Sequence, residues 1–87
     1  MPEIGKTNLR VLTKGEYHRG KKTGKWITFD ENGTKTREEN FSDGEWHGKR
    51  ARWYKNGRIR EVYNYHHGTL HGKWETWHKN GQKMGEG

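Results

Sequence analysis

The sequence repeats itself every 24 residues, and this period constrains the fold more than any other feature. Glycine-lysine pairs begin three equivalent segments, at 24–25, 48–49 and 72–73. The aromatic position shared by these segments holds Phe29, Trp53 and Trp77. A fixed period of this length is typical of repeat proteins, in which each unit is one small element stacked on the next. We therefore expect a scaffold assembled from similar units.

The repeat accounts for almost the whole chain. Units cover residues 20–43, 44–67 and 68–87, and a half unit covers residues 8–19, in which Asn8 is in register with the later asparagines. Little sequence remains for anything else, so we predict one repeat domain over residues 1–87.

Three Asn-Gly pairs, at 32–33, 56–57 and 80–81, predict tight β-hairpins. Both residue types tolerate positive φ, and the resulting turn matches the twist of the flanking strands. The predicted strands are 25–30 with 34–42, 49–55 with 58–66, and 73–78 with 82–84. The glycine-bracketed segments 44–48 and 68–72 are interpreted as short polar loops.

These hairpins predict an all-β fold, a single-layer antiparallel meander with about 24 residues per repeat. Helix is disfavoured because glycine interrupts every helical pattern. Alternation along a strand places Ile27 and Phe29 on one face and Trp26 and Thr28 on the other. Aromatic residues thus occur on both faces, and at least one face should present aromatic and basic groups to solvent or to a partner.

The composition indicates a thin core. The 87 residues include eleven aromatics but only ten Leu, Ile, Val and Phe, with a net charge of +7 and no cysteine. Disulfides and thiolate metal sites are therefore excluded. A domain of this size with so few aliphatic residues is marginal alone, so we expect a protein partner or a homodimer.

Three phrases carry a family resemblance: Gly-Lys-Trp-x-x-Phe-x-x-Asn-Gly at 24–33, His-Gly-Lys through Asn-Gly at 47–57, and His-Gly-Lys-Trp-x-x-Trp-x-x-Asn-Gly at 71–81. They resemble MORN repeats, and look closest to the bacterial variant that is described as antitoxin-like. The resemblance implies consecutive hairpins in an elongated sheet, with roles in protein interaction, dimerisation or lipid association. It implies no catalytic activity. The chain departs from the pattern at Arg50, which stands where the other units have Trp26 and Trp74.

The six histidines raise a metal or catalytic alternative. His66, His67 and His71 are close in sequence, but neither cysteine nor an acidic residue accompanies them in a known zinc pattern. Turn packing is the simpler interpretation, so we expect no metal and no cofactor. No nucleophile is paired with a base, and an open sheet offers no pocket, so we expect no enzyme and no small-molecule substrate.

The basic residues raise a second alternative. Many fall in repeat positions and would form a cationic stripe across the strands: Lys21, Lys22, Lys25, Lys49, Arg50, Arg52, Lys55, Arg58, Arg60 and Lys73. Such a stripe with interleaved aromatics suits the phosphates of nucleic acid or acidic lipid headgroups. The opposing interpretation is a solvated face that keeps the sheet soluble. Acidic residues of the middle unit would weaken the stripe.

The leading hypothesis is a non-enzymatic protein-binding module, antitoxin-like or inhibitory, including a phage-encoded inhibitor of a bacterial enzyme or defence nuclease. Trp46 breaks the repeat, and as an exposed loop residue beside Arg50 it would make a good interface anchor. The predicted contact residues are Lys25, Trp26, Trp46, Arg50, Arg52, Trp53, Tyr54, Trp74 and Trp77. No apolar stretch has the length of a signal peptide core or a membrane span, so we expect a cytoplasmic protein.

Overall fold

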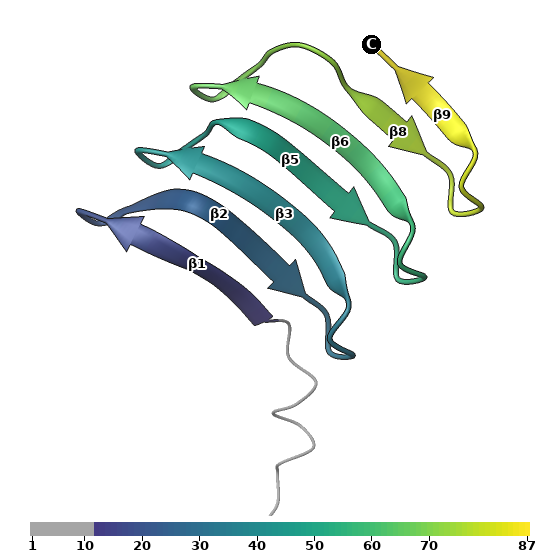
Figure 1. The fold of residues 1–87 in the computed structure, drawn as a ribbon, viewed down its shortest axis with the longest axis horizontal. Helices are drawn as coiled ribbons and strands as arrows, with labels where there is room; N and C mark the ends of the chain where they lie inside the picture. The colour runs from purple at the N-terminus through teal and green to yellow at the C-terminus, as the bar shows by residue number, and fades with distance from the viewer. Residues whose placement is uncertain (1–11) are drawn as a thin grey trace, which may run out of the picture.

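A computed structural model describes residues 12–87, and every element in that range is a strand or a turn (Figure 1). Residues 8–11 of the predicted half unit at 8–19, including Asn8, lie outside the described range, and the rest of the half unit is described. The strands are β1 (Leu12–His18), β2 (Lys21–Phe29), β3 (Lys35–Ser42), β4 (Glu45–Trp46), β5 (Gly48–Trp53), β6 (Ile59–His66), β7 (Thr69–Leu70), β8 (Glu75–Trp77) and β9 (Lys83–Glu86).

The strands form one antiparallel sheet in the order β1-β2-β3-β5-β6-β8-β9, and the short strands β4 and β7 pair with β3 and β6. Neighbours in the sheet are neighbours in sequence, so the predicted meander is confirmed (Figure 1). The molecule measures 49 × 41 × 11 Å, and the shortest dimension is that of a single sheet. The described residues include no helix that could cross a membrane.

The Asn-Gly pairs do form hairpins, but not with the backbone that the sequence predicted. In each pair only the glycine has positive φ; Gly33 is at 85°. The Gly33 N–H donates to the Asp30 carbonyl, and the Asp30 N–H donates to the Thr34 carbonyl, both at 2.9 Å. These bonds define a three-residue loop that closes with a left-handed glycine, and a register shift follows in each strand pair.

The turns with positive φ at both positions lie at the opposite end of the sheet. Asp43 and Gly44 have φ values of 52° and 81°, the combination that a type I′ turn requires. Arg19-Gly20 and His67-Gly68 repeat this geometry. The interpretation of residues 44–48 and 68–72 as loops is therefore wrong in part, because the residues that follow each turn form β4 and β7.

These two-residue turns also connect one unit to the next. The Gly44 N–H donates to the Lys22 carbonyl at 3.0 Å, and the Gly68 N–H donates to the Trp46 carbonyl at 2.8 Å. The two bonds are equivalent, because their donors are 24 residues apart and so are their acceptors. The hairpin turn at the start of one unit therefore rests on a strand of the preceding unit.

The sheet has two faces and no second layer among the described residues. Ile27, Glu38, Ala51 and Val62 are cross-strand neighbours on one face, named here the Trp53 face. The opposite side is the Trp26 face. Among residues 12–87, only Trp26, Glu38 and Ala51 are buried, with exposed fractions of 8%, 6% and 1%. The central strands are otherwise mostly half-buried and β1 is exposed, in line with the expected thin core.

Candidate partner-binding surfaces

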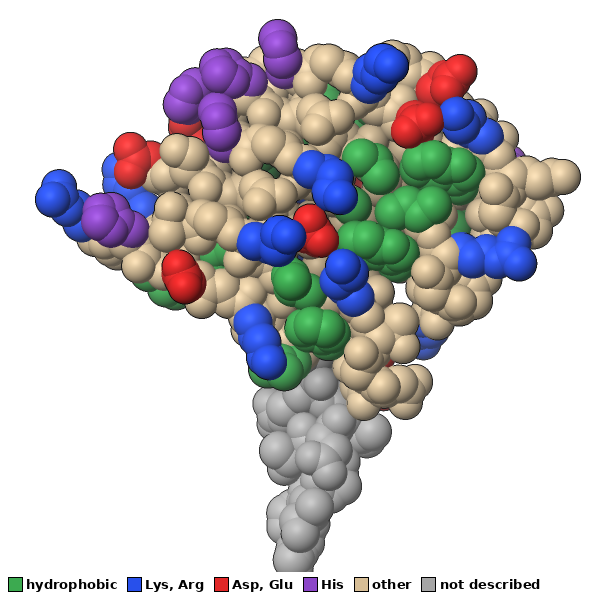
Figure 2. Space-filling model, viewed as in Figure 1, with side chains coloured by type: hydrophobic (Ala, Val, Ile, Leu, Met, Phe, Trp, Pro, Cys, Tyr) green, Lys and Arg blue, Asp and Glu red, His purple; other side chains and the backbone are tan. Residues whose placement is uncertain are grey.

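The Trp53 face carries the aromatic position that the three units share. Phe29, Trp53 and Trp77 each lie beside a register shift, paired with Lys35, Ile59 and Lys83. Figure 2 views this face and shows hydrophobic side chains gathered where β5 and β8 end and β6 begins, with basic side chains around them. Within the described chain, no second layer of strands covers the row of rings, which are half-buried.

Lysine ammonium groups lie over these rings. Lys35 Nζ is 4.5 Å from the Trp53 ring centre, and Lys83 Nζ is 6.0 Å from that of Trp77. Within the described residues, neither indole N–H donates a hydrogen bond to the protein, and neither is a buried polar atom without a partner. These two N–H groups therefore remain accessible to solvent or to a bound molecule.

A second row on this face consists of lysines from alternate strands. Lys25 and Lys49 flank Asn40 in the sheet, and Lys49 and Lys73 flank Asn64. The asparagines hold the row together, because Asn40 Nδ2 donates to the Lys49 carbonyl at 2.7 Å. Lysines on alternate strands lie about 10 Å apart. Three members of the predicted cationic stripe therefore form a row on this face, interrupted by one carboxylate, whereas Lys22, Arg50 and Arg52 lie on the Trp26 face.

That carboxylate belongs to Glu38. Its oxygens lie 3.9 Å from Lys25 Nζ, 3.4 Å from Lys35 Nζ and 3.9 Å from Lys49 Nζ. Three ammonium groups around one buried carboxylate compensate its desolvation, and in return Glu38 removes part of the charge that the stripe could offer an anion.

The last hairpin has its own ion network on the Trp53 face. Lys83 Nζ donates to Glu75 Oε2 and Glu86 Oε1, both at 2.8 Å. These hydrogen bonds raise the pKa of Lys83 and, from the other side, the Lys83 bond lowers the pKa of Glu86. Both groups are fully charged at neutral pH.

The Trp26 face uses its aromatic residues internally. The Trp26 ring packs at right angles to Tyr17, with ring centres 5.1 Å apart, and Lys22 Nζ lies 4.8 Å above it. Its indole N–H donates to the carbonyls of Glu16 and Thr23 at 3.2 Å. Trp26 is thus a core residue, and the prediction that it contacts a partner is untested.

The middle unit replaces this arrangement with an ion pair. Glu39 Oε2 accepts from Trp46 Nε1 at 3.0 Å and from Arg50 Nε at 3.3 Å. The Arg50 guanidinium lies 4.3 Å from the Trp46 ring centre, and Tyr65 packs on Trp46 at 5.0 Å. Trp46 is half-buried in β4, so its prediction as an exposed loop residue was wrong, while its proximity to Arg50 is confirmed and its contact with a partner stays a prediction.

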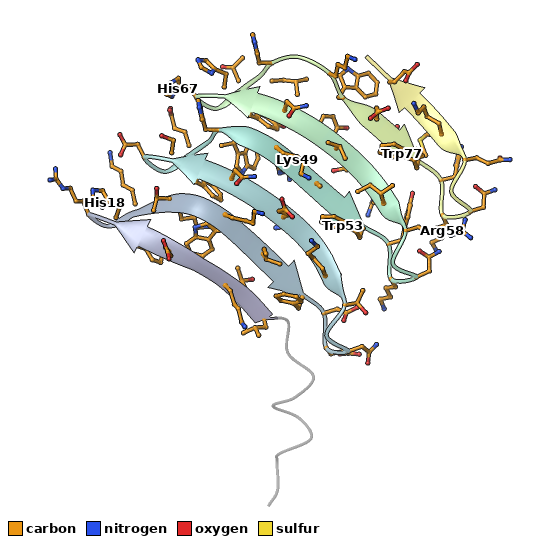
Figure 3. The ribbon with its side chains drawn as sticks, in the orientation of Figure 1. His18, Lys49, Trp53, Arg58, His67 and Trp77 are labelled. Atoms are coloured by element: carbon orange, nitrogen blue, oxygen red, sulfur yellow. The ribbon has the colours of Figure 1, made fainter. Side chains whose placement is uncertain are left out.

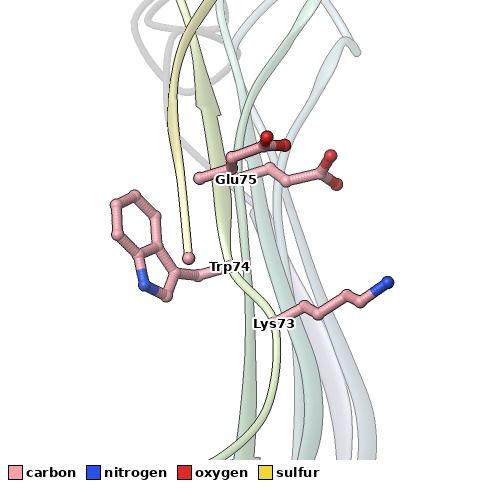
Figure 4. A pocket seen from close by; sticks show the side chains of 5 residues that line it. Lys73, Trp74 and Glu75 are labelled. Carbon is pink, nitrogen blue, oxygen red and sulfur yellow. The ribbon is translucent and has the colours of Figure 1, made fainter.

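The third unit returns to tryptophan. Trp74 stacks on Tyr63, with ring centres 6.2 Å apart and an angle of 24° between the rings. Figure 4 shows Trp74 on one side of the ribbon and Lys73 and Glu75 on the other, around a surface hollow of about 460 Å³. The hollow lies at the edge of the sheet, and residues from both faces of the sheet line it.

The predicted contact residues therefore do not form one surface. Lys25, Trp53 and Trp77 lie on the Trp53 face, as the Glu38 contact and the register place them. The members on the Trp26 face are Trp26, Trp46, Arg50, Arg52 and Trp74. Tyr54 lies where β5 meets its turn, and its hydroxyl donates to the Trp77 carbonyl at 2.7 Å.

Sequence reasoning missed Lys35 and Lys83, which cover the shared aromatic rings. A signal was present, because the two lysines are 48 residues apart and occupy the same position of the repeat. It also missed Glu39, whose partner Arg50 was noticed only as a departure from the pattern.

Comparison with known proteins supports the repeat. The model of the family described as MORN repeat variant matches residues 22–43 and 70–87, which lie in the first and third units. The middle unit, where Arg50 replaces tryptophan, lies outside the matched residues. No curated protein and no solved structure matches the chain. The MORN repeat is a general module that often mediates binding. The chain is therefore similar to the MORN repeat variant over the first and third of its units, and the sheet is built as that repeat implies.

Proposed function

We propose that the protein is a non-enzymatic binding module that docks a protein target on the Trp53 face. One observation carries the proposal: a single-layer sheet leaves Phe29, Trp53 and Trp77 in a row that has no second layer over it in the described chain, with only lysine side chains above the rings. Tryptophans in such positions supply large contact areas and dominate the binding energy of many interfaces.

The unused hydrogen-bonding groups favour this face over the other. The indole N–H groups of Trp26 and Trp46 are already bonded within the Trp26 face. Those of Trp53 and Trp77 have no protein acceptor among the described residues, so a target can supply one. Burying a tryptophan whose N–H is satisfied adds affinity without a desolvation cost.

The charge of the Trp53 face indicates what kind of target fits. Six lysines on this face, Lys14, Lys25, Lys35, Lys49, Lys73 and Lys83, accompany four glutamates, Glu16, Glu38, Glu75 and Glu86. A complementary protein surface has an apolar centre and an acidic rim. An antitoxin-like or inhibitory role, with the module covering an acidic site on an enzyme, is one form of this proposal.

Replacing the two tryptophans tests it. The double variant Trp53→Ser and Trp77→Ser should weaken the dissociation constant for a captured target by about thirty-fold or more, because interface tryptophans commonly contribute 2 kcal/mol or more. Capture from source cells by the tagged full chain, read by mass spectrometry, identifies the target, and calorimetry then measures its affinity.

The matched control is Leu70→Ser. Leu70 is 46% exposed and is paired with Tyr65 on the Trp26 face. The substitution therefore removes an exposed apolar group from that face. It should leave the affinity unchanged. A target that binds the double variant as well as the parent chain, with both folded by circular dichroism, would refute docking on the Trp53 face.

The row of Lys25, Lys49 and Lys73 favours a second candidate, an anionic ligand such as nucleic acid or acidic lipid headgroups. Such binding should fall steeply between 50 and 200 mM salt, since it depends on released counterions. Binding to single-stranded DNA or to phosphatidylserine vesicles at two salt concentrations distinguishes it from docking on buried aromatics. The variant Lys73→Gln should weaken it, because Lys73 makes no ion pair with Glu38 in the described structure.

A further inference from the structure

The end of the sheet that carries the two-residue turns gathers histidines from two units. Figure 3 labels His18 and His67 at this end and Arg58 at the other, and Figure 2 shows histidine side chains gathered there. His66 is the last residue of β6 and His67 begins the turn. His47 follows β4 at the start of the same unit, where the Gly68 N–H bond to the Trp46 carbonyl holds the turn against it.

Three of these imidazoles converge. Each of His47, His66 and His67 has a ring nitrogen within 4.8 Å of a nitrogen on the other two. Their ring centres are 4.6 to 4.9 Å apart, and His71 lies 5.7 Å from His66. Sequence spacing had associated His66 with His71. The structure adds His47, which is 19 residues away in sequence and closer in space.

The cluster is not a consequence of the repeat itself. One unit earlier, the positions of His47, His66 and His67 hold Thr23, Ser42 and Asp43. The sheet therefore builds the same junction without a single histidine. Their concentration at one junction calls for a property that imidazole has and these smaller polar side chains lack.

We infer that His47, His66 and His67 form a binding site for a divalent transition-metal ion, with Zn²⁺ as the reference ion. Imidazole is a preferred ligand of zinc, copper and nickel, and three histidines with one open position form a known zinc ligand set. The proposal is independent of docking on the Trp53 face, because it concerns the end of the sheet.

The geometry requires a small rearrangement. Nitrogens bound to one tetrahedral zinc lie about 3.3 Å apart, so the three side chains must rotate inward from their present separation. His66 and His67 are exposed, and His47 is half-buried. Rotation of exposed imidazoles costs little, because no packed core has to move with them.

A carboxylate stands in the position of an orienting group. Glu45 Oε1 lies 3.6 Å from His67 Nδ1. With the Nδ1–H directed at this carboxylate, Nε2 of His67 is left as the metal ligand, which is the common arrangement of zinc-bound histidines. The sequence-based objection that no acidic residue accompanies the histidines is met by Glu45, which β4 places beside His67.

One existing hydrogen bond opposes binding. The His67 backbone N–H donates to His47 Nδ1 at 3.2 Å. Coordination through either nitrogen of His47 breaks this bond, since the ring must then either protonate Nδ1 or give that lone pair to the metal.

The test is a calorimetric titration of the full chain with ZnCl₂ at pH 7.5, with histidine ring resonances followed by NMR. We expect one Zn²⁺ per chain and shifted ring signals of His47, His66 and His67. The variant His66→Gln should weaken binding by at least about tenfold, and Glu45→Gln by about tenfold as an orienting residue. The control His78→Gln, at the opposite end of the sheet, should bind zinc as the parent chain does.

Three results would overturn the site. They are the absence of Zn²⁺ binding at millimolar metal, equal loss of binding in His66→Gln and His78→Gln, and a stoichiometry of one Zn²⁺ per two chains. The last result would show a metal bridge between copies. Circular dichroism of each variant shows whether it is folded, and His47→Gln provides a second ligand variant if His66→Gln fails to fold.

Discussion

At the scale of single residues, glycine and tryptophan are matched across strands. Trp26 lies over Gly15 of β1, and a Cβ atom at residue 15 would fall inside the indole ring. Trp74 lies in the same way over Gly87. Position 15 recurs as Glu39, Tyr63 and Gly87 in the later units, so its occupant changes with its partner at the tryptophan position.

The first prediction follows from this contact. Gly15→Ala should lower the free energy of unfolding by about 1 to 3 kcal/mol. The added methyl group would overpack the Trp26 ring, whose N–H is fixed by hydrogen bonds to two carbonyls. Urea denaturation measures it. The matched control is Gly85→Ala in β9, where a Cβ would meet Thr76 and Trp74 at ordinary distances of 3.5 and 3.6 Å. Equal effects of the two substitutions would contradict the explanation.

The second prediction concerns the ion pair of the middle unit. Arg50 and Glu39 have side-chain exposures of 18% and 13%, so solvent screens their attraction less than that of a surface pair. A double-mutant cycle with Arg50→Met and Glu39→Gln should give a coupling of roughly 0.5 to 3 kcal/mol. The same cycle on Lys83 and Glu86, which are 43% and 64% exposed, should give a smaller coupling, because solvent screens an exposed pair. Thermal unfolding at two salt concentrations checks both.

At the scale of elements, the two ends of the hairpins use different turns, and this gives a third prediction. Asp43 has φ of 52°, whereas Asn32 does not have positive φ. Asp43→Ala should therefore cost about 1 kcal/mol, because alanine in the left-handed region is strained. Asn32→Ala should be nearly neutral, since the side chain that binds this turn is that of Asp30. A larger effect at Asn32 would restore the turn geometry that the sequence suggested.

The comparison of sequence and structure is clearest at this scale. The alternation of Ile27 and Trp26 to opposite faces was predictable, because it depends only on the period of a strand. The turn type was not, since Asn-Gly is compatible with both kinds of hairpin and the choice depends on register. The position of His47 beside His67 was unpredictable for the same reason. Its proximity to His67 depends on how the turn of one unit rests on β4 of another, and that strand had been interpreted as a loop.

At the scale of the whole molecule, a single-layer sheet divides its tasks between its surfaces. The Trp26 face holds the units together through bonded indoles and the Glu39 pair. The Trp53 face carries rings that only lysine side chains lie over, and one end of the sheet gathers imidazoles. A repeat in which only neighbouring units touch permits this division, because a substitution in one unit perturbs little beyond the next.

The histidine end gives the last prediction, a dependence of stability on pH. His66 titrates below its ordinary pKa of 6.5 in the folded chain, so as pH falls through 6.5 the unfolded chain takes up this proton first. Its contribution to stability is therefore complete above pH 6.5 and is lost as pH falls below that value. The melting temperature of the parent chain should drop between pH 7 and 5, and the melting temperature of His66→Gln should drop less. His78→Gln, outside the cluster, should follow the parent, and an identical pH profile for all three chains would show that repulsion among the imidazoles does not act on the fold.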